Sequence, residues 1–238
     1  MKIIKKYITV LFILLSPIIF LFRKLIFGNF LFMSGDSLAP LAIKESIKNI
    51  IEDFGEFPLW FPYIYSGMPS IHSLLNINNY YFPHKIISLF HYLGLPWFWN
   101  FIFHYAFASI GMYLLLRYLD QKKIVSIFSA ILFSFSPYMV AYLVHGHGSQ
   151  IMTAAYIPWI CWGLLKLWDE QNLQNLGILA ILAGFQLQRG HIQIAYYTWI
   201  IIGIFILYKL ATSKFSPTFY YYLFGSLFFG FLMSASII

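Results

Sequence analysis

The chain has 238 residues, of which 61% are hydrophobic and only 10% carry a charged side chain. A soluble domain of this length could not hide so much apolar surface behind so few charges, so the composition excludes a water-soluble protein and indicates an integral membrane protein. The net charge of +7 does not indicate a nucleic-acid partner, because the basic residues occur in short clusters between apolar runs, as membrane-topology signals do.

The first apolar run follows three lysines in residues 1–6 and extends from Tyr7 to Phe27. No small-residue cleavage site follows it, so we interpret it as an uncleaved first transmembrane helix rather than a signal peptide. Arg23 and Lys24 lie near its far end, where we expect them to extend toward the lipid headgroups. Residues 28–96 then form one long, less hydrophobic connection.

Six further apolar runs predict transmembrane helices, each of about the length that a ~30 Å hydrocarbon core requires, except the short fifth span. The sequence therefore predicts an all-α polytopic membrane protein of about seven spans, in one membrane domain over residues 1–238. The last run stops without a flanking charge or loop, so we expect the chain to be the N-terminal part of a longer protein. The runs cover residues 97–116, 124–144, 151–168, 173–187, 192–210 and about 218 to the end.

The basic residues favour one orientation, with the N-terminus in the cytoplasm and the long first loop outside. Nine of the fifteen basic residues fall on one side of the predicted spans, and five of the other six lie in or beside the long loop, which counts less toward orientation. All seven histidines then fall in the outer half. The nine are Lys2, Lys5, Lys6, Arg117, Lys122, Lys123, Lys166, Lys209 and Lys214.

The start of the long loop predicts an amphipathic helix over residues 38–54, with Ser37 as its N-cap and Gly55 as its stop. A helix of this kind directly after a membrane boundary should lie along the interface. Asp36 would then lie at the membrane surface. It is either itself a capping residue or, if Ser37 takes the cap, free to act as a base or metal ligand; both interpretations stay open.

The next segment, from Pro58 to Pro69, cannot form a regular helix because of its prolines and Gly67. Trp60, Tyr63 and Tyr65 suit the membrane interface, where an apolar ring meets a wet edge. They are either an aromatic belt that fixes the loop or a wall that binds a lipid-linked sugar.

Two short tips between later spans carry the other candidate groups. His145 and His147 flank a glycine and could converge on a metal or a phosphate, although hydrated surface histidines are the ordinary alternative. The second tip holds Arg189 and His191 among three glutamines, and polar groups at the edge of a short span often mark function. Arg189 is a candidate for gripping a phosphate, with simple extension toward the headgroups as the alternative.

The order of several motifs resembles the bacterial YfhO-type membrane proteins. The motifs cover nearly the whole chain, although no paired acidic motif lies beside Asp36. That family is similar to the GT-C superfamily of polytopic glycosyltransferases, so the resemblance implies a GT-C-like fold in the bacterial cytoplasmic membrane. The motifs are Gly35-Asp36, Pro58-Leu-Trp60, Pro62-Tyr-Ile, Gly67-Met-Pro69, Tyr81-x-Pro83, Gly146-His147, Ala155-Tyr-Ile-Pro158 and Gly190-His191-x-Gln193-x-x-x-Tyr197.

The resemblance implies transfer of a sugar from a polyprenyl-phosphate carrier to a cell-envelope acceptor at the outer face. Asp36 would be the base or metal ligand. Arg189, with His145, His147 or His191, would neutralise the phosphate, while Trp60, Tyr63 and Tyr65 would bind the prenyl chain and the sugar. A divalent cation such as Mg²⁺ or Mn²⁺ is a candidate cofactor, with Asp36, His145 and His147 as candidate ligands.

Two other classes of function remain open from the sequence. A transporter or flippase of a lipid-linked substrate predicts broken helices matched across internal repeats, and the sequence shows no such repeat. A non-catalytic membrane scaffold predicts polar residues scattered over both faces, whereas the histidines here gather on one.

Overall fold

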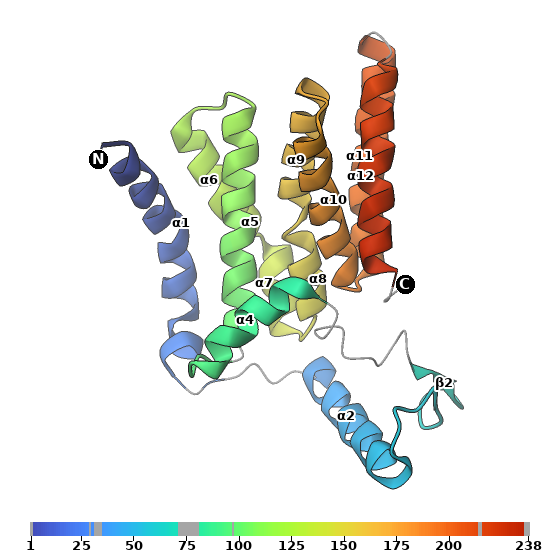
Figure 1. The fold of residues 1–238 in the computed structure, drawn as a ribbon. Helices are drawn as coiled ribbons and strands as arrows, with labels where there is room; N and C mark the ends of the chain where they lie inside the picture. Colours follow the sequence, from blue (N-terminus) through green and yellow to red (C-terminus); the bar gives the residue numbers. More distant parts are fainter. Residues whose placement is uncertain are drawn as a thin grey trace.

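The computed structural model describes residues 2–28, 30, 35–70, 81–96, 98–213 and 216–235. These residues are mostly helical, which confirms the predicted all-α class, with one two-stranded hairpin in the long loop. Figure 1 shows the helices as a bundle of roughly parallel rods, with α4 lying across one end. We call this end the α4 end. His72 and Lys214, which entered the topology count, lie outside the described residues.

The first predicted span is one helix, α1 (Lys2–Phe27), which packs beside α5 (Trp99–Tyr118) and α6 (Lys123–Ser134). Val10 and Leu14 of α1 are buried against Tyr113 of α5 and Ala130 of α6. Arg23 donates to the Phe20 carbonyl at 2.9 Å and remains exposed at the outer surface of α1. The N-terminal part of α1 lies at the end of the bundle opposite α4 (Figure 1).

The third and fourth predicted spans remain candidate membrane spans, but each consists of two helices with a short break between them. The third consists of α6 and α7 (Pro137–Val144), and the fourth of α8 (Gly148–Ala154) and α9 (Ile157–Asp169). Pro137 is the first residue of α7 and Pro158 the second residue of α9, where proline is tolerated because its missing amide hydrogen would have no partner in the first turn. Ser136 caps α7 by accepting a hydrogen bond from the Met139 amide.

The remaining spans are α10 (Leu173–Gln188), α11 (Ile192–Thr212) and α12 (Pro217–Ser234). Helices α10 and α12 approach closely at two glycines. A Cβ atom added to Gly230 would lie 3.0 Å from the Ala180 carbonyl oxygen, and one added to Gly184 would lie 3.1 Å from the Gly230 carbonyl oxygen. Small residues at such a crossing let two helix backbones pack directly, as they do inside membranes.

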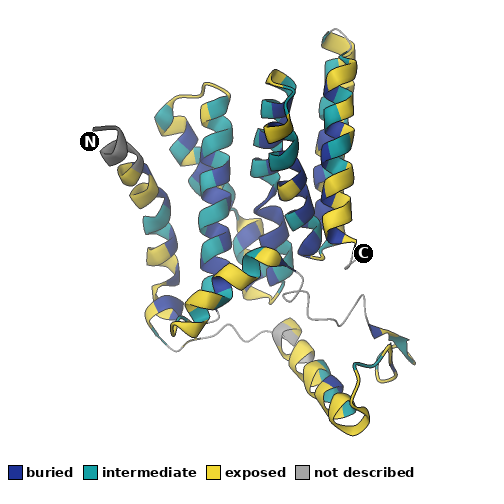
Figure 2. Cartoon of the chain, viewed as in Figure 1, coloured by how far each residue is buried: buried dark blue, intermediate teal, exposed yellow. Residues whose placement is uncertain are grey.

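The distribution of side chains fits a helical protein in a bilayer. Figure 2 shows exposed residues along the outer faces of the bundle, and many of them are large and apolar, such as Phe12, Ile204 and Phe224. Polar pairs lie inside instead, including Ser109 and Ser134, whose hydroxyls are 2.7 Å apart. Five segments of the described residues are long and apolar enough to cross a membrane, and α10 is apolar but shorter. The count of about seven spans stays a prediction.

The long first loop contains two helices and a hairpin. Helix α2 (Gly35–Phe54) begins three residues earlier than predicted, so residue 37 lies inside the helix rather than at its cap, and Asp36 lies in the first turn. Strand β1 (Trp60–Phe61) pairs antiparallel with β2 (Met68–Pro69). Helix α4 (Phe82–Tyr92) was not predicted, because its eleven residues were taken as part of the connection.

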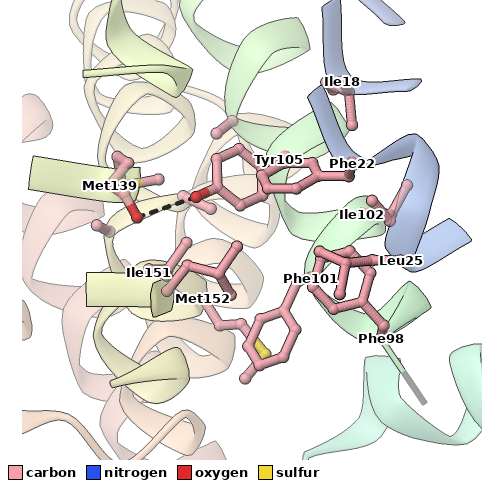
Figure 3. Close-up of a cluster of buried hydrophobic side chains, with 14 of the residues drawn as sticks. Ile18, Phe22, Leu25, Phe98, Phe101, Ile102, Tyr105, Met139, Ile151 and Met152 are labelled. Atoms are coloured by element: carbon pink, nitrogen blue, oxygen red, sulfur yellow. Dashed lines mark hydrogen bonds between the residues drawn. The ribbon is translucent and has the colours of Figure 1, made fainter. Parts of the chain in front are cut away.

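A buried apolar cluster fixes the short helices at the α4 end (Figure 3). Phe22 of α1 and Tyr105 of α5 have ring centroids 5.1 Å apart, and Ile151 of α8 is fully buried in the same cluster. The Tyr105 hydroxyl donates to the Met139 carbonyl of α7 at 2.9 Å. This cluster therefore holds the turn between α7 and α8, which carries His147, against the two long helices α1 and α5.

Candidate functional site

The turn between α7 and α8 places His147 by a specific backbone geometry. Gly146 has a φ of +91°, its amide donates to the Leu143 carbonyl, and the His147 amide donates to the Tyr142 carbonyl. This pair of hydrogen bonds is the Schellman motif, in which the left-handed residue is normally glycine. His147 follows directly and stands at the N-cap position of α8.

The turn between α10 and α11 is built in a similar way. Gly190 has a φ of +71° and donates to the Leu187 carbonyl, and His191 stands at the N-cap position of α11. The His191 Nδ1 atom accepts a hydrogen bond from the Ile194 amide at 3.4 Å. Both tips therefore end a helix with glycine and begin the next helix with a histidine, at the same end of the bundle.

Asp36 and His147 are brought into contact. The His147 Nε2 atom lies 3.1 Å from the Asp36 Oδ2 atom, and both side chains remain partly exposed to solvent. The Tyr142 ring lies beside His147, with centroids 5.5 Å apart, and limits the orientation of the imidazole. The first turn of α2 and the α7–α8 tip, which are far apart in the sequence, thus share one acid–base pair.

His191 lies close enough to His147 for their charges to interact. Burial lowers the pKa of His191, and the positive charge that His147 carries when protonated lowers it further. His191 therefore favours its neutral form beside the Asp36–His147 pair. The structure thus brings two of the predicted site residues, Asp36 and His147, into contact, and His191 lies near enough to feel the charge of His147.

These residues do not assemble into a metal site in the described part of the chain. No group of three or more His, Cys, Asp or Glu side chains there has a geometry that could hold a metal ion. His145 is exposed at the C-cap of α7, and the described residues show no contact between it and His147. Of this pair, only His147 is shown in contact with another predicted site residue, and the joint binding of a metal or phosphate by both histidines stays a prediction.

Arg189 lies in a second, buried part of the site, with only 4% of its surface exposed. Its guanidinium carbon lies 4.7 Å from the centroid of the Tyr81 ring, which is a cation–π contact. Burial lowers the Arg189 pKa, while Tyr81 and Tyr156 act in the opposite direction. Even so, a guanidinium keeps its charge in proteins, so a fixed positive charge lies inside this end of the bundle.

The neighbouring glutamines are structural. Gln186 donates to the Thr198 hydroxyl at 2.8 Å and to the Thr153 carbonyl, and Gln188 donates to the Met233 carbonyl at 2.8 Å. They therefore tie α10 to α8, α11 and α12 and fix the helix end from which Arg189 extends. Of the polar residues in this tip, Gln186 and Gln188 therefore join helices, and Arg189 supplies the buried charge.

Tyr81, whose ring lies under the Arg189 guanidinium, is held in place by a buried chain of hydrogen bonds, which we call the relay. Its hydroxyl lies 3.0 Å from His104 Nε2 and also bonds the Tyr156 hydroxyl. His104 Nδ1 lies 2.6 Å from the Asn100 carbonyl oxygen and must donate to it, so Nε2 accepts from Tyr81. Burial raises the pKa of Tyr81 to about 12, which keeps its donating proton in place.

Asn100 of α5 connects this relay to α4. Its side-chain amide donates to His91 Nε2 at 2.9 Å, and its side-chain oxygen lies 3.3 Å from His84 Nδ1. His91 Nδ1 in turn donates to the Leu95 carbonyl at 2.9 Å. Burial lowers the pKa of His84, which favours the neutral ring in this network. Two histidines of α4 and one of α5 are thus organised by a single asparagine.

The sequence did not single out Tyr81, Asn100, His104 or Tyr156 as site residues. One signal was available: Asn100 and His104 are polar and four residues apart, so they share one face of an otherwise apolar helix. Tyr81 and Tyr156 stood within the motifs Tyr81-x-Pro83 and Ala155-Tyr-Ile-Pro158, but those motifs assigned neither tyrosine a role in a site.

The aromatic residues Trp60, Tyr63 and Tyr65 lie outside both parts of the site. They belong to the β1–β2 hairpin, which Figure 1 shows away from the helices that carry His147 and Arg189. Tyr63 and Tyr65 are exposed, and Trp60 packs over Gly67, where a Cβ atom would clash with the indole. Their expected contact with a substrate stays a prediction.

The α4 end therefore combines a partly exposed acid–base pair, Asp36 and His147, with a buried cation, Arg189, that lies over the ring of Tyr81 in a tyrosine–histidine relay. The arrangement can accept a proton at the surface and stabilise negative charge below it. No protein family, no curated protein and no solved structure matches this chain, so its function has to be inferred from this chemistry.

Proposed function

We propose that the chain belongs to a membrane glycosyltransferase that moves a sugar from a polyprenyl-phosphate carrier to a cell-envelope acceptor at the outer face of the bacterial cytoplasmic membrane. The contact between Asp36 and His147 carries the proposal. It places a carboxylate, already oriented by an imidazole, at the start of the first loop, where the resemblance to YfhO-type and GT-C proteins expects the base.

In this reaction Asp36 accepts the proton of the acceptor hydroxyl, and His147 holds the carboxylate in position. The acceptor oxygen forms a bond to the anomeric carbon as the bond from that carbon to the phosphate oxygen breaks. The electron pair leaves with the phosphate, and the configuration at the anomeric carbon is inverted. No step is assigned to a divalent cation, because the described candidate ligands do not form a site for one.

Arg189 would stabilise the negative charge of the departing phosphate. Its burial supports this role, because a charge acts more strongly in a partly dry site than in water. It lies two residues before His191, so one short turn supplies both a fixed cation and a histidine near the Asp36–His147 pair.

The experiment replaces Asp36 with Asn in the full chain and measures release of polyprenyl phosphate from a polyprenyl-phospho-sugar in bilayers. Glu52→Gln is the matched control, because Glu52 is an exposed carboxylate of the same helix that contacts only Lys48, at 3.6 Å, among the ion pairs of the described residues. We expect Asp36→Asn to abolish release and Glu52→Gln to retain it. Full activity of Asp36→Asn at normal expression would exclude the assignment.

Transport of a lipid-linked substrate is the second candidate, and the broken helices support it. Two consecutive spans are interrupted, α6–α7 and α8–α9, and transporters often bind substrate at discontinuous helices. Movement of a fluorescent lipid-linked sugar across proteoliposomes, without cleavage of its phosphate bond, would favour transport over transfer.

A further inference from the structure

Helix α4 presents a continuous apolar stripe to its surroundings. Phe82, Ile86, Leu89 and Leu93 recur every three or four residues, so they lie on one face of the helix. All four are exposed in the structure, Leu89 by 57% and the C-capping Leu93 by 71%. An exposed stripe of this kind on a helix requires an apolar environment.

The opposite face of α4 is bound to the protein. Ile87 is buried, and His84 and His91 hydrogen-bond Asn100 of α5. Phe90 packs against Phe103 of α5 with ring centroids 5.2 Å apart. These contacts fix the orientation of α4. At its N-terminal end Phe82 also stacks on Phe185 of α10, with ring centroids 6.2 Å apart, while Ile86, Leu89 and Leu93 stay exposed on the face away from α5.

The position of α4 identifies what covers the stripe. The helix lies across the end of the bundle (Figure 1), and only residues 93–98 separate it from α5, a candidate membrane span. The level of α4 is therefore the level at which α5 enters the membrane. The outer faces of the spans are apolar as well, so the stripe continues a surface that already requires lipid.

The flanks of the stripe fit the same environment. Lys85 and the highly exposed Tyr92 lie on one flank, and α4 contains no acidic residue. A tyrosine and a lysine beside an apolar face are typical of helices at the boundary between acyl chains and headgroups, where the basic group meets lipid phosphates.

We propose that α4 is an interfacial helix that inserts Phe82, Ile86, Leu89 and Leu93 into the acyl boundary of the membrane. The phosphate-containing layer then lies beside Tyr81, the residue directly before α4, on whose ring Arg189 rests. The inference does not depend on the proposed reaction, because it concerns only the depth of the helix.

The test measures the depth of single nitroxide labels on the full chain in lipid nanodiscs. The only cysteine is replaced first, as Cys161→Ser. Labels are then placed at Leu89, Ile86 and Lys85, with Phe12 on α1 as the lipid-exposed control and Lys122, between α5 and α6, as the aqueous control. Collision with oxygen reports the acyl region, and collision with a water-soluble nickel chelate reports the aqueous phase.

We expect the ratio of oxygen to nickel accessibility at Leu89 and Ile86 to approach that at Phe12 and to exceed that at Lys122 several-fold. Lys85 should give a lower ratio than Leu89. A ratio at Leu89 and Ile86 equal to that at Lys122 would overturn the proposal, because the stripe would face water. Shielding of both labels from both reagents would also overturn it, because protein would then cover the stripe.

Discussion

The Nε2 atom of His147 lies 3.1 Å from the Oδ2 atom of Asp36, so the α7–α8 tip contacts the first turn of α2. This contact joins two segments that are far apart in the chain. It defines where proton transfer is expected, and several of the following predictions depend on it or on the relay behind it.

The first prediction concerns His147. Its replacement by Gln removes the partner that orients Asp36, and loss of a hydrogen bond to a charged group costs about 1.5–3 kcal/mol. We expect the rate of phosphate release to fall by roughly 10- to 100-fold. His145→Gln, two residues earlier and exposed, is the matched control and should leave the rate unchanged. Equal effects of the two variants would contradict the assignment.

The second prediction concerns the relay. Tyr81→Phe removes the hydroxyl that donates to His104 and bonds Tyr156, leaving both buried groups without it. We expect a loss of stability of about 1–3 kcal/mol, seen as a lower unfolding temperature in detergent. Tyr156→Phe should cost less, because Tyr81 can still donate to His104. A larger effect of Tyr156→Phe would contradict the assignment in which the Tyr81 hydroxyl donates to His104.

The third prediction concerns pH. Burial lowers the pKa of His84 from its ordinary value of 6.5, so the unfolded chain binds more protons than the folded chain just below that pH. His84 therefore contributes stability that is present above pH 6.5 and lost as the pH falls through its folded pKa. We expect the unfolding temperature to drop between about pH 7 and pH 5. The drop should be smaller in His84→Gln, which cannot titrate; an identical drop would contradict the prediction.

The fourth prediction concerns Gly146, whose φ of +91° disfavours any residue with a side chain. Gly146→Ala should destabilise the protein by about 1–2 kcal/mol and weaken the contact between His147 and Asp36. Gly177→Ala is the control, because Gly177 lies within α10 with nothing within 4 Å of an added Cβ. That change should be neutral or stabilising by roughly 0.5–1 kcal/mol, as alanine favours helix. Thermal unfolding of both variants checks the pair.

The fifth prediction concerns Asn100. Asn100→Leu removes the bonds to His84 and His91, so α4 should open more often. Hydrogen exchange of residues 84–92 should accelerate, while exchange in α10 should not change. Ser88→Ala is the control, because the Ser88 hydroxyl donates to the Lys85 carbonyl within α4, at 2.9 Å. Acceleration by both variants alike would show that Asn100 does not anchor the helix.

Most of the helical framework could be predicted from the sequence, because long apolar runs have few alternatives in a membrane protein. The predicted runs correspond to α1, α5 and α11 within a few residues. The breaks before Pro137 and Pro158 were not predicted, because each run is apolar throughout and was therefore assigned as one span. The preference of proline for the first turn of a new helix was not considered. Ser136-Pro137 was a readable helix start, since serine caps and proline suits the first turn.

The candidate site could be predicted only in part. Asp36, His147 and His191 were each recognisable as polar residues at span edges, but their proximity depends on packing between distant segments. In the packed structure His145 is exposed, and Gln186 and Gln188 form hydrogen bonds between helices. Tyr81 and Tyr156 became a buried pair through contacts that no local pattern encodes.

The interruptions at residues 135–136 and 155–156 have a mechanical consequence for His147. They isolate α7 and α8 as a short helical pair joined to the rest of the chain by two points where helical hydrogen bonding stops. A force on His147, from Asp36 or from a bound molecule, therefore acts first on this pair. The buried cluster around Tyr105 and Ile151 holds this pair against α1 and α5, so a tilt of α6 or α9 need not move His147 away from Asp36.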